Sequence, residues 1–141
     1  MTRIFRRSHF MGALFFAIAG AALLLATTPW TRASEPALPR GSGISSWHEN
    51  GSQGRYVVEL LAGTLPAAAA GGLHGTVMTD ADCAPDAQGL NHCHNVIVLD
   101  DATRVTVINH HQMSRHHCLR PGESVRMTPL VGHWATVQTL D

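Results

Sequence analysis

Six short runs rich in Val, Ile and Thr follow one another in the C-terminal part of the chain, and clusters of Gly, Pro, Asp or Asn separate them. Each run has the length and composition of a β-strand. A small domain built only from short strands removes its exposed edges most simply by closing the sheet. We therefore predict an all-β domain over residues 55–141, a five- or six-stranded barrel or rolled antiparallel sheet of OB or SH3-like type. The expected strands are 55–63, 75–80, 94–100, 103–109, 123–130 and 134–140.

The N-terminal segment has the features of an export signal. Three arginines precede an uncharged run over residues 10–31, and Ala33 ends a small-x-small junction suited to signal peptidase. We expect residues 1–33 to be a signal peptide and the protein to be periplasmic or secreted. The alternative is an anchor in the inner membrane formed by residues 10–31, because this run just reaches the roughly 20 residues that span a bilayer.

Residues 34–54 are dense in Pro, Gly, Ser and Asn, and Trp47 is their only aromatic residue. This composition is typical of a flexible linker. The sequence therefore predicts three parts, a signal peptide, a linker and a β domain.

The charge of the exported part limits its partners. The chain has no lysine, and beyond residue 33 it carries six arginines and ten acidic residues, a net charge of −4 with neutral histidines. A nucleic-acid partner needs a basic surface, so we exclude one. A cation is a more natural ligand for this chain than an anion.

Two histidine-rich stretches, NHCHN over residues 91–95 and NHHQMSRHHC over residues 109–118, give the strongest functional signal. Imidazole combined with thioether and thiolate suits copper, especially Cu(I), and imidazole with thiolate alone suits zinc. Magnesium and calcium prefer oxygen ligands. The candidate metal ligands are His92, His94, His110, His111, Met113, His116, His117 and Cys118.

A hairpin of the expected strands 94–100 and 103–109 decides which of these histidines face each other. A two-residue Asp-Ala loop, or a four-residue loop in the same register, opposes Val98 to Val105. All four valines of the hairpin then share one face. A shift by one residue would oppose valines to polar residues, which burial disfavours. We therefore predict the register with paired valines.

Extension of this ladder to its open end predicts the positions of the histidines. Because side chains alternate along a strand, His92 and His94 continue the valine face, and His111 lies opposite His92. Opposite Cβ atoms are about 4.5–5.5 Å apart, which lets two imidazoles share one ion. On the reverse face Cys93 lies opposite His110. We expect three imidazoles on one face to form a metal site, to which the following loop brings further ligands.

The chain contains three cysteines, Cys83, Cys93 and Cys118. In an oxidising compartment two of them should pair and leave one thiol. A Cys83–Cys93 disulfide would close a short turn-rich loop, and a Cys93–Cys118 disulfide would join two segments near the open end of the hairpin. The sequence leaves both pairings open. With the first pairing, Cys118 is the remaining thiol and a candidate ligand for a soft metal.

These features predict an exported metal-binding protein that acts as a chaperone, scavenger or resistance factor. Copper is the expected ion and zinc the alternative, and the expected partner besides the ion is a periplasmic metal-handling protein. The export, size and ligand set are similar in kind to small periplasmic copper chaperones with an OB-type barrel, although no motif matches them residue by residue.

Two alternatives belong to other functional classes. An interaction module could use the crowded histidines as a pH switch, and its behaviour would not depend on chelators. A small hydrolase could hold zinc with three histidines and use Glu123 or Asp86 as a general base. A Cys118 nucleophile could also be activated by His116 or His117. A domain of this size leaves little room for a substrate cleft and has no nucleophile motif, so binding is favoured over catalysis.

Overall fold

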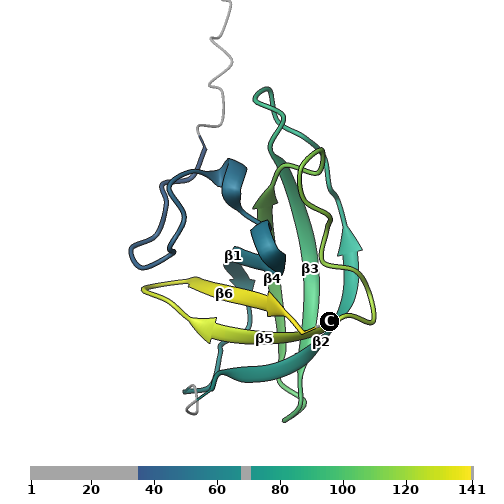
Figure 1. Cartoon of the computed structure of the whole chain (residues 1–141). Coiled ribbons are helices and arrows are strands. Elements are labelled where there is room, and N and C mark those ends of the chain that lie inside the picture. Colours follow the sequence, from purple (N-terminus) through teal and green to yellow (C-terminus); the bar gives the residue numbers. More distant parts are fainter. Residues whose placement is uncertain (1–34, 68–70, 141) are drawn as a thin grey trace, which may run out of the picture. The chain divides into compact units, whose positions relative to one another are not determined.

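The computed structural model describes residues 35–67 and 71–140, and it is a closed antiparallel barrel (Figure 1). The strand order is β1-β4-β3-β2-β5-β6, and β6 also pairs with β1. The predicted all-β class and the closed barrel are confirmed. The elements in chain order are the 3-10 turns η1 (Trp47–Glu49) and η2 (Ser52–Gly54) and the strands β1 (Arg55–Ala62), β2 (Leu73–Ala81), β3 (Asn91–Leu99), β4 (Arg104–His111), β5 (Ser124–Pro129) and β6 (Trp134–Thr139).

The expected signal peptide, residues 1–33, and the alternative anchor, residues 10–31, lie outside the described residues. Within residues 35–67 and 71–140, no helix has the length and apolar character needed to cross a bilayer.

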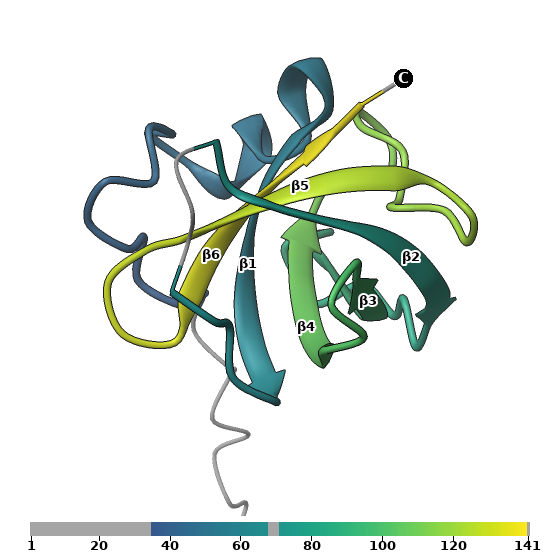
Figure 2. The ribbon, with the colours of Figure 1, turned by 90° about the horizontal axis from the view of Figure 1, so that it is seen from below.

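Alternate side chains of the strands fill the interior of the barrel. Figure 2 shows the barrel from below. In β1, for example, Tyr56 and Val58 belong to the interior cluster, whereas Val57 between them belongs to a second cluster on the outer surface. This is the two-residue period expected of a strand. The buried members of the interior cluster are Tyr56, Val58, Val77, Ile97, Leu99, Val105, Val107, Leu119, Val125, Met127, Ala135 and Val137.

The segment 35–54, which its composition predicts to be a flexible linker, instead packs on the outer surface of the barrel (Figure 1). Its Trp47 is only 2% exposed and packs in the outer cluster with Val57, Leu90 and Trp134. The Trp47 indole nitrogen donates a hydrogen bond of 2.7 Å to the carbonyl of Pro36. Leu38 and Ile44 of the same segment also pack against this cluster, so burial of Trp47 with these two side chains attaches the segment to the barrel.

Asn50 connects this segment to the barrel. Its side-chain NH2 donates to the carbonyls of Val57, at 2.9 Å, and His110, at 2.7 Å, and its oxygen accepts from the backbone N–H of Val57 at 2.6 Å. These bonds join the segment to both β1 and β4. Because Asn50 is fully buried, each of them replaces a hydrogen bond that water would otherwise provide.

The β3–β4 hairpin has a different register from the predicted one. His92 pairs with His110, Ile97 with Val105, and Val98 with Arg104, so the expected pairing of valines is wrong by one residue. The interior face of the hairpin carries the odd-numbered residues of both strands.

The loop explains the shift. Leu99 donates to the carbonyl of Thr103 and Ala102 donates to the carbonyl of Leu99, at 2.8 and 2.9 Å, which leaves a loop of three residues. Ala102 adopts φ +69°, the left-handed conformation that commonly closes such a loop. An odd number of loop residues reverses the face on which each β4 side chain lies. Burial alone did not reveal this, because β3 has large apolar residues on both faces.

Candidate metal centre

The observed register brings His92 and His110 directly opposite each other on the outer face of the barrel. Their ring centroids are 5.0 Å apart, and their Nδ1 atoms approach to 2.7 Å. Both residues are among the candidate ligands from the sequence, but the predicted register placed them on opposite faces.

A carboxylate holds the far nitrogen of each ring. The Nε2 atom of His92 lies 3.2 Å from Asp86 Oδ2, and the Nε2 atom of His110 lies 3.2 Å from Glu59 Oε2. The other oxygen of Glu59 lies 3.2 Å from His133 Nε2. We call these five residues, Asp86, His92, His110, Glu59 and His133, the imidazole chain.

The protonation of the imidazole chain follows from its contacts. An ionised carboxylate only accepts hydrogen bonds, so hydrogen bonds to ionised Asp86 and Glu59 would place hydrogen on the Nε2 atoms of His92 and His110. In a neutral imidazole the other nitrogen, Nδ1, then has a lone pair and no hydrogen. Two lone pairs would face each other at 2.7 Å and repel. A cation between the two Nδ1 atoms, either a proton or a metal ion, would remove this repulsion.

One side of the pair is buried and the other is open to solvent. His110 is 5% exposed and lies against the rings of Trp47 and Trp134, with centroid separations of 5.1 and 6.0 Å. Burial lowers the pKa of His110, and the hydrogen bond to Glu59 opposes this effect only in part. The His92 side chain is 33% exposed, so an ion could approach from that side.

The turn between β2 and β3 prepares Asp86 for its contact with His92. Burial alone would raise the pKa of Asp86, but the backbone N–H groups of Leu90 and Gln88, with His92, lower it overall. These two N–H groups lie 2.9 and 2.8 Å from Asp86 Oδ1. The Asp86 carboxylate therefore stays ionised, and its other oxygen, Oδ2, is directed at His92.

The expected trio of imidazoles on one face does not form. His94 lies opposite Ile108 on the outer face, with its Nδ1 atom 3.4 Å from an oxygen of the exposed Asp82. His111 points into the barrel and is fully buried, and burial lowers its pKa. Its Nε2 atom has no hydrogen-bond partner within the described residues. The predicted site of His92, His94 and His111 is therefore wrong, since the sheet separates His111 from the other two.

The loop after β4 does not add its side chains to the imidazole chain. Met113 and His117 are exposed, and the ring of His116 bonds to the backbone carbonyl of His48 at 3.2 Å. The backbone carbonyl of His117 accepts a hydrogen bond from the Tyr56 hydroxyl, away from the imidazole chain.

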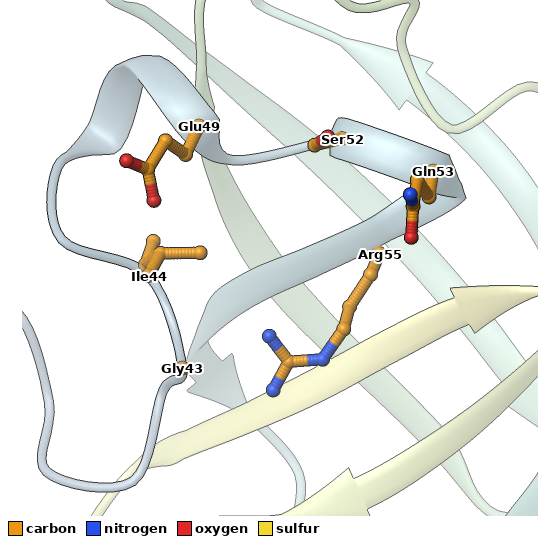
Figure 3. Close-up of a pocket in the computed structure, with 6 residues that line it drawn as sticks. All are labelled: Gly43, Ile44, Glu49, Ser52, Gln53 and Arg55. Atoms are coloured by element: carbon orange, nitrogen blue, oxygen red, sulfur yellow. The ribbon is translucent and has the colours of Figure 1, made fainter.

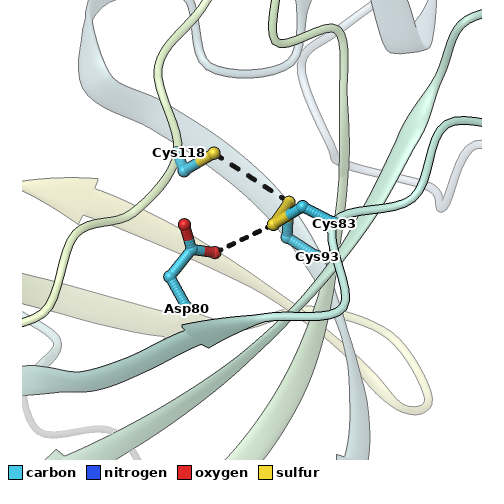
Figure 4. A group of neighbouring side chains, drawn as sticks. All are labelled: Asp80, Cys83, Cys93 and Cys118. Carbon is cyan, nitrogen blue, oxygen red and sulfur yellow. Dashed lines mark hydrogen bonds between the residues drawn. A yellow bond between two sulfur atoms is a disulfide. The ribbon is translucent and has the colours of Figure 1, made fainter.

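The cysteines form a separate cluster in which Cys83 and Cys93 are joined by a disulfide and Cys118 is free (Figure 4). This is the first of the two pairings that the sequence leaves open. Ligand atoms of Asp80 and all three cysteines lie within 4.8 Å of one another, so the group could hold a metal ion, but the disulfide engages two of its sulfurs. Burial, and to a lesser degree Asp80, raises the pKa of Cys118 to about 11.

Sequence reasoning did not find Glu59 and His133, and it considered Asp86 only as a general base. One signal for Glu59 was present, because it is an acidic residue inside the apolar strand sequence YVVELL. His133 gave no comparable signal, since it is an isolated histidine that reaches Glu59 only through the closure of the barrel.

The pockets of the described part of the chain give little support for a large ligand. One pocket adjoins the imidazole chain at His133 and Trp134. Another lies on the segment before β1 and contains no member of the imidazole chain (Figure 3). The pocket on the segment before β1 is lined by Gly43, Ile44, Glu49, Ser52, Gln53 and Arg55.

Comparisons with protein-family models, with curated proteins and with solved structures found no match to this chain.

Proposed function

We propose that this chain is an exported metal-binding protein that carries one copper ion between the Nδ1 atoms of His92 and His110, as a chaperone, scavenger or resistance factor. Zinc is the alternative ion. The observation that carries the proposal is the 2.7 Å approach of two Nδ1 atoms whose opposite nitrogens are both held by carboxylates.

The distance between the two Nδ1 atoms is close to what one ion requires. Two imidazole nitrogens at about 2.0 Å from a tetrahedral ion are about 3.3 Å apart. A movement of the His92 ring by about 0.6 Å is therefore enough to admit the ion. His92 can make this movement because it is partly exposed, whereas His110 is fixed by Trp47.

The carboxylates support the same interpretation. Histidines that bind metal usually donate their other N–H to a carboxylate or carbonyl, which fixes the tautomer and makes the ligand more basic. Asp86 and Glu59 both stand in this relation to the pair. Imidazole ligands suit copper and zinc, and they do not favour magnesium or calcium.

Two protein ligands favour transfer over permanent storage. A structural zinc site is closed by four protein ligands, whereas a site with open positions exchanges its ligands. On the exposed side of His92, a ligand from a periplasmic metal-handling protein could replace water on the ion. We therefore place the exchange of copper with such a partner on the exposed side of His92.

A proton could occupy the same position, and this makes the pH-switch module the second candidate. The proton-bound pair of imidazoles would be lost as the pH rises. Such a module would respond to pH and would not respond to metal or chelator.

The test measures metal content and thermal unfolding of the protein, produced with its own N-terminal segment and exposed to Cu(I), Cu(II), Zn(II) or chelator. We expect one ion per chain and an increase in Tm that chelator reverses, because an ion that binds only the folded state stabilises it. The variant His92→Ala should lose both effects. His74→Ala removes an exposed imidazole of β2 and should behave like the parent. A Tm that ignores metal but changes with pH would replace copper binding by the pH switch.

A further inference from the structure

The group of Asp80, Cys83, Cys93 and Cys118, which we call the sulfur cluster, lies on the other side of the sheet from the imidazole chain. Cys93 points into the barrel, whereas its neighbour His92 points outward. The free Cys118 places its Sγ atom 4.0 Å from Cys93 Sγ, and Asp80 Oδ1 lies 3.2 Å from Cys83 Sγ (Figure 4). Three chain segments thus meet at one end of the barrel without any residue of the imidazole chain.

We propose that the Cys83–Cys93 disulfide masks a second metal site, which opens on reduction and then binds a thiophilic cation of the zinc class through Cys83, Cys93, Cys118 and Asp80. This inference does not depend on copper binding by His92 and His110.

The distances suit such an ion. Thiolates at about 2.3 Å from a tetrahedral ion are about 3.8 Å apart. The Sγ atoms of Cys118 and Cys93 are already at 4.0 Å, and the Asp80 oxygen lies within 4.8 Å of every sulfur. Once the covalent bond is broken, the sulfurs of Cys83 and Cys93 can move apart to ligand spacing. Three thiolates and one carboxylate complete the four ligands that zinc prefers.

The surroundings hold Asp80 in place. The amide of the buried Asn95 donates to Asp80 Oδ1 at 3.1 Å and to the carbonyl of Leu119 at 3.2 Å. It thereby connects the carboxylate to the segment that carries Cys118. A hydrogen bond of this kind orients a ligating carboxylate. The side-chain oxygen of Asn95 has no hydrogen-bond partner among the described residues, so the polar end of the barrel has unused bonding capacity beside the cluster.

The turn that carries Cys83 has other attachments besides the disulfide. Asn91 donates from its side chain to the carbonyl of Cys83 at 2.9 Å, and a β-bridge joins Pro85 to Asn91. These contacts keep Cys83 near Cys93 after reduction. Because Cys83, Cys118 and Asp80 are all partly exposed, a reductant and an ion can both reach them.

The redox step is a two-electron reduction. A dithiol reductant gives two electrons and two protons to the Cys83–Cys93 bond, which breaks to form two thiols, while the reductant becomes a cyclic disulfide. The cation then displaces the three thiol protons, which pass to solvent. Exchange with the cyclic disulfide of the same reductant class reverses both steps: the cyclic disulfide accepts the two electrons and two protons from solvent, the Cys83–Cys93 bond forms again, the ion is released and Cys118 regains its proton.

The test uses Co(II) as a spectroscopic probe and Zn(II) as its competitor. The parent protein is compared before and after treatment with a dithiol reductant that is then removed under anaerobic conditions. We expect a thiolate-to-cobalt charge-transfer band in the reduced protein only, with one Co(II) per chain at this site and loss of the band on addition of Zn(II). Cys118→Ser should keep the disulfide in the oxidised protein, and in the reduced protein it should weaken both Co(II) binding and the band, because only two of the three thiolates remain. His92→Ala should keep the band, which separates this site from the imidazole chain.

A reduced protein without the band, or a Cys118→Ser variant with unchanged band intensity and Co(II) affinity, would overturn the proposal. Circular dichroism shows whether reduction itself unfolds the chain. In that event the metal is added during refolding, and a recovery of the β-sheet signal with Zn(II) that Cys118→Ser abolishes supports the site. An equal recovery in the variant, or none in the parent, contradicts it.

Discussion

The Nδ1 atom of His92 lies 2.7 Å from the Nδ1 atom of His110, although the two residues are 18 positions apart in the chain. This contact depends on the register of one hairpin and on parts of the chain that flank it. Glu59 comes from β1 and Asp86 from the turn before β3, and Trp47 comes from the segment before the barrel. A site assembled from so many segments is intact only when the barrel is closed, so metal binding and folding should be coupled.

The first prediction concerns the carboxylate behind His110. Glu59→Gln should lower copper affinity by about 10- to 100-fold, because loss of a carboxylate that orients a ligating histidine typically has this effect. Glu59 is partly exposed, so the fold should persist. A titration in competition with a chromogenic chelator measures the affinity, and circular dichroism checks the fold.

Glu49→Gln is the matched control for this change. Glu49 is an exposed carboxylate that bonds only to Ser45 among the described residues, so its loss should leave copper affinity unchanged. Equal affinities in Glu59→Gln and in the parent would show that Glu59 does not support a metal ligand.

The strands could be predicted from the sequence because each is a short β-branched run with turn residues on both sides. The observed elements match the six expected runs, and the largest differences are the extra residues at the start of β2 and β3 and at the end of β4. The register of the hairpin could not be predicted, because it depends on one residue in the loop. Ala102 takes a left-handed conformation that an alanine does not signal.

Composition drew attention to the histidine-rich stretches, but it could not predict which side chains each histidine contacts. His92 and His110 are in the histidine-rich stretches, but their contact required the observed register. Glu59 and His133 reach the site through pairing of β1 with β4 and β6, which is information about distant contacts. The order of residues 35–54 was missed for a similar reason, since Trp47 is buried by residues far away in the chain.

The second prediction tests the role of this segment. Trp47→Ala should lower the free energy of unfolding by about 3–5 kcal/mol, the usual cost of removing a large buried aromatic side chain. Unfolding in urea measures the change. Leu61→Ala is the control, because Leu61 is 58% exposed and its loss should change the stability by less than about 0.5 kcal/mol. Similar values for the two variants would mean that the segment does not contribute to the stability of the barrel.

The third prediction concerns the ionisation of Tyr56, the only tyrosine of the chain. Burial, with the charges of Glu123 and Cys118, raises its pKa from 10.0 to about 12. Its hydroxyl also donates to the carbonyl of His117 at 2.6 Å. Tyrosinate absorbance should therefore appear near pH 12 in the native protein and near pH 10 in denaturant.

The sign of the linked stability change follows from these two pKa values. Between pH 10 and about 12 the unfolded chain has lost the phenolic proton and the folded chain retains it. The stabilising contribution of Tyr56 is thus complete below pH 10, and it falls by up to about 1.4 kcal/mol per pH unit as the pH rises through this window. Urea unfolding at several pH values measures the slope. A native tyrosinate midpoint near pH 10 would contradict the burial of this hydroxyl.

The last prediction concerns the loop that sets the register of the hairpin. Ala102 has φ +69° and is exposed, so glycine can replace it without loss of a buried contact. The left-handed conformation costs an L-residue about 1–2 kcal/mol and glycine almost nothing, while glycine loses more entropy on folding. We expect Ala102→Gly to raise the free energy of unfolding by about 0.5–1 kcal/mol, measured with urea. Ala87→Gly, at an exposed turn residue whose φ is not positive, should have no effect or lower it. Destabilisation by both changes would show that Ala102 is not left-handed and that the loop does not have three residues, and the pairing of His92 with His110 would then lose its basis.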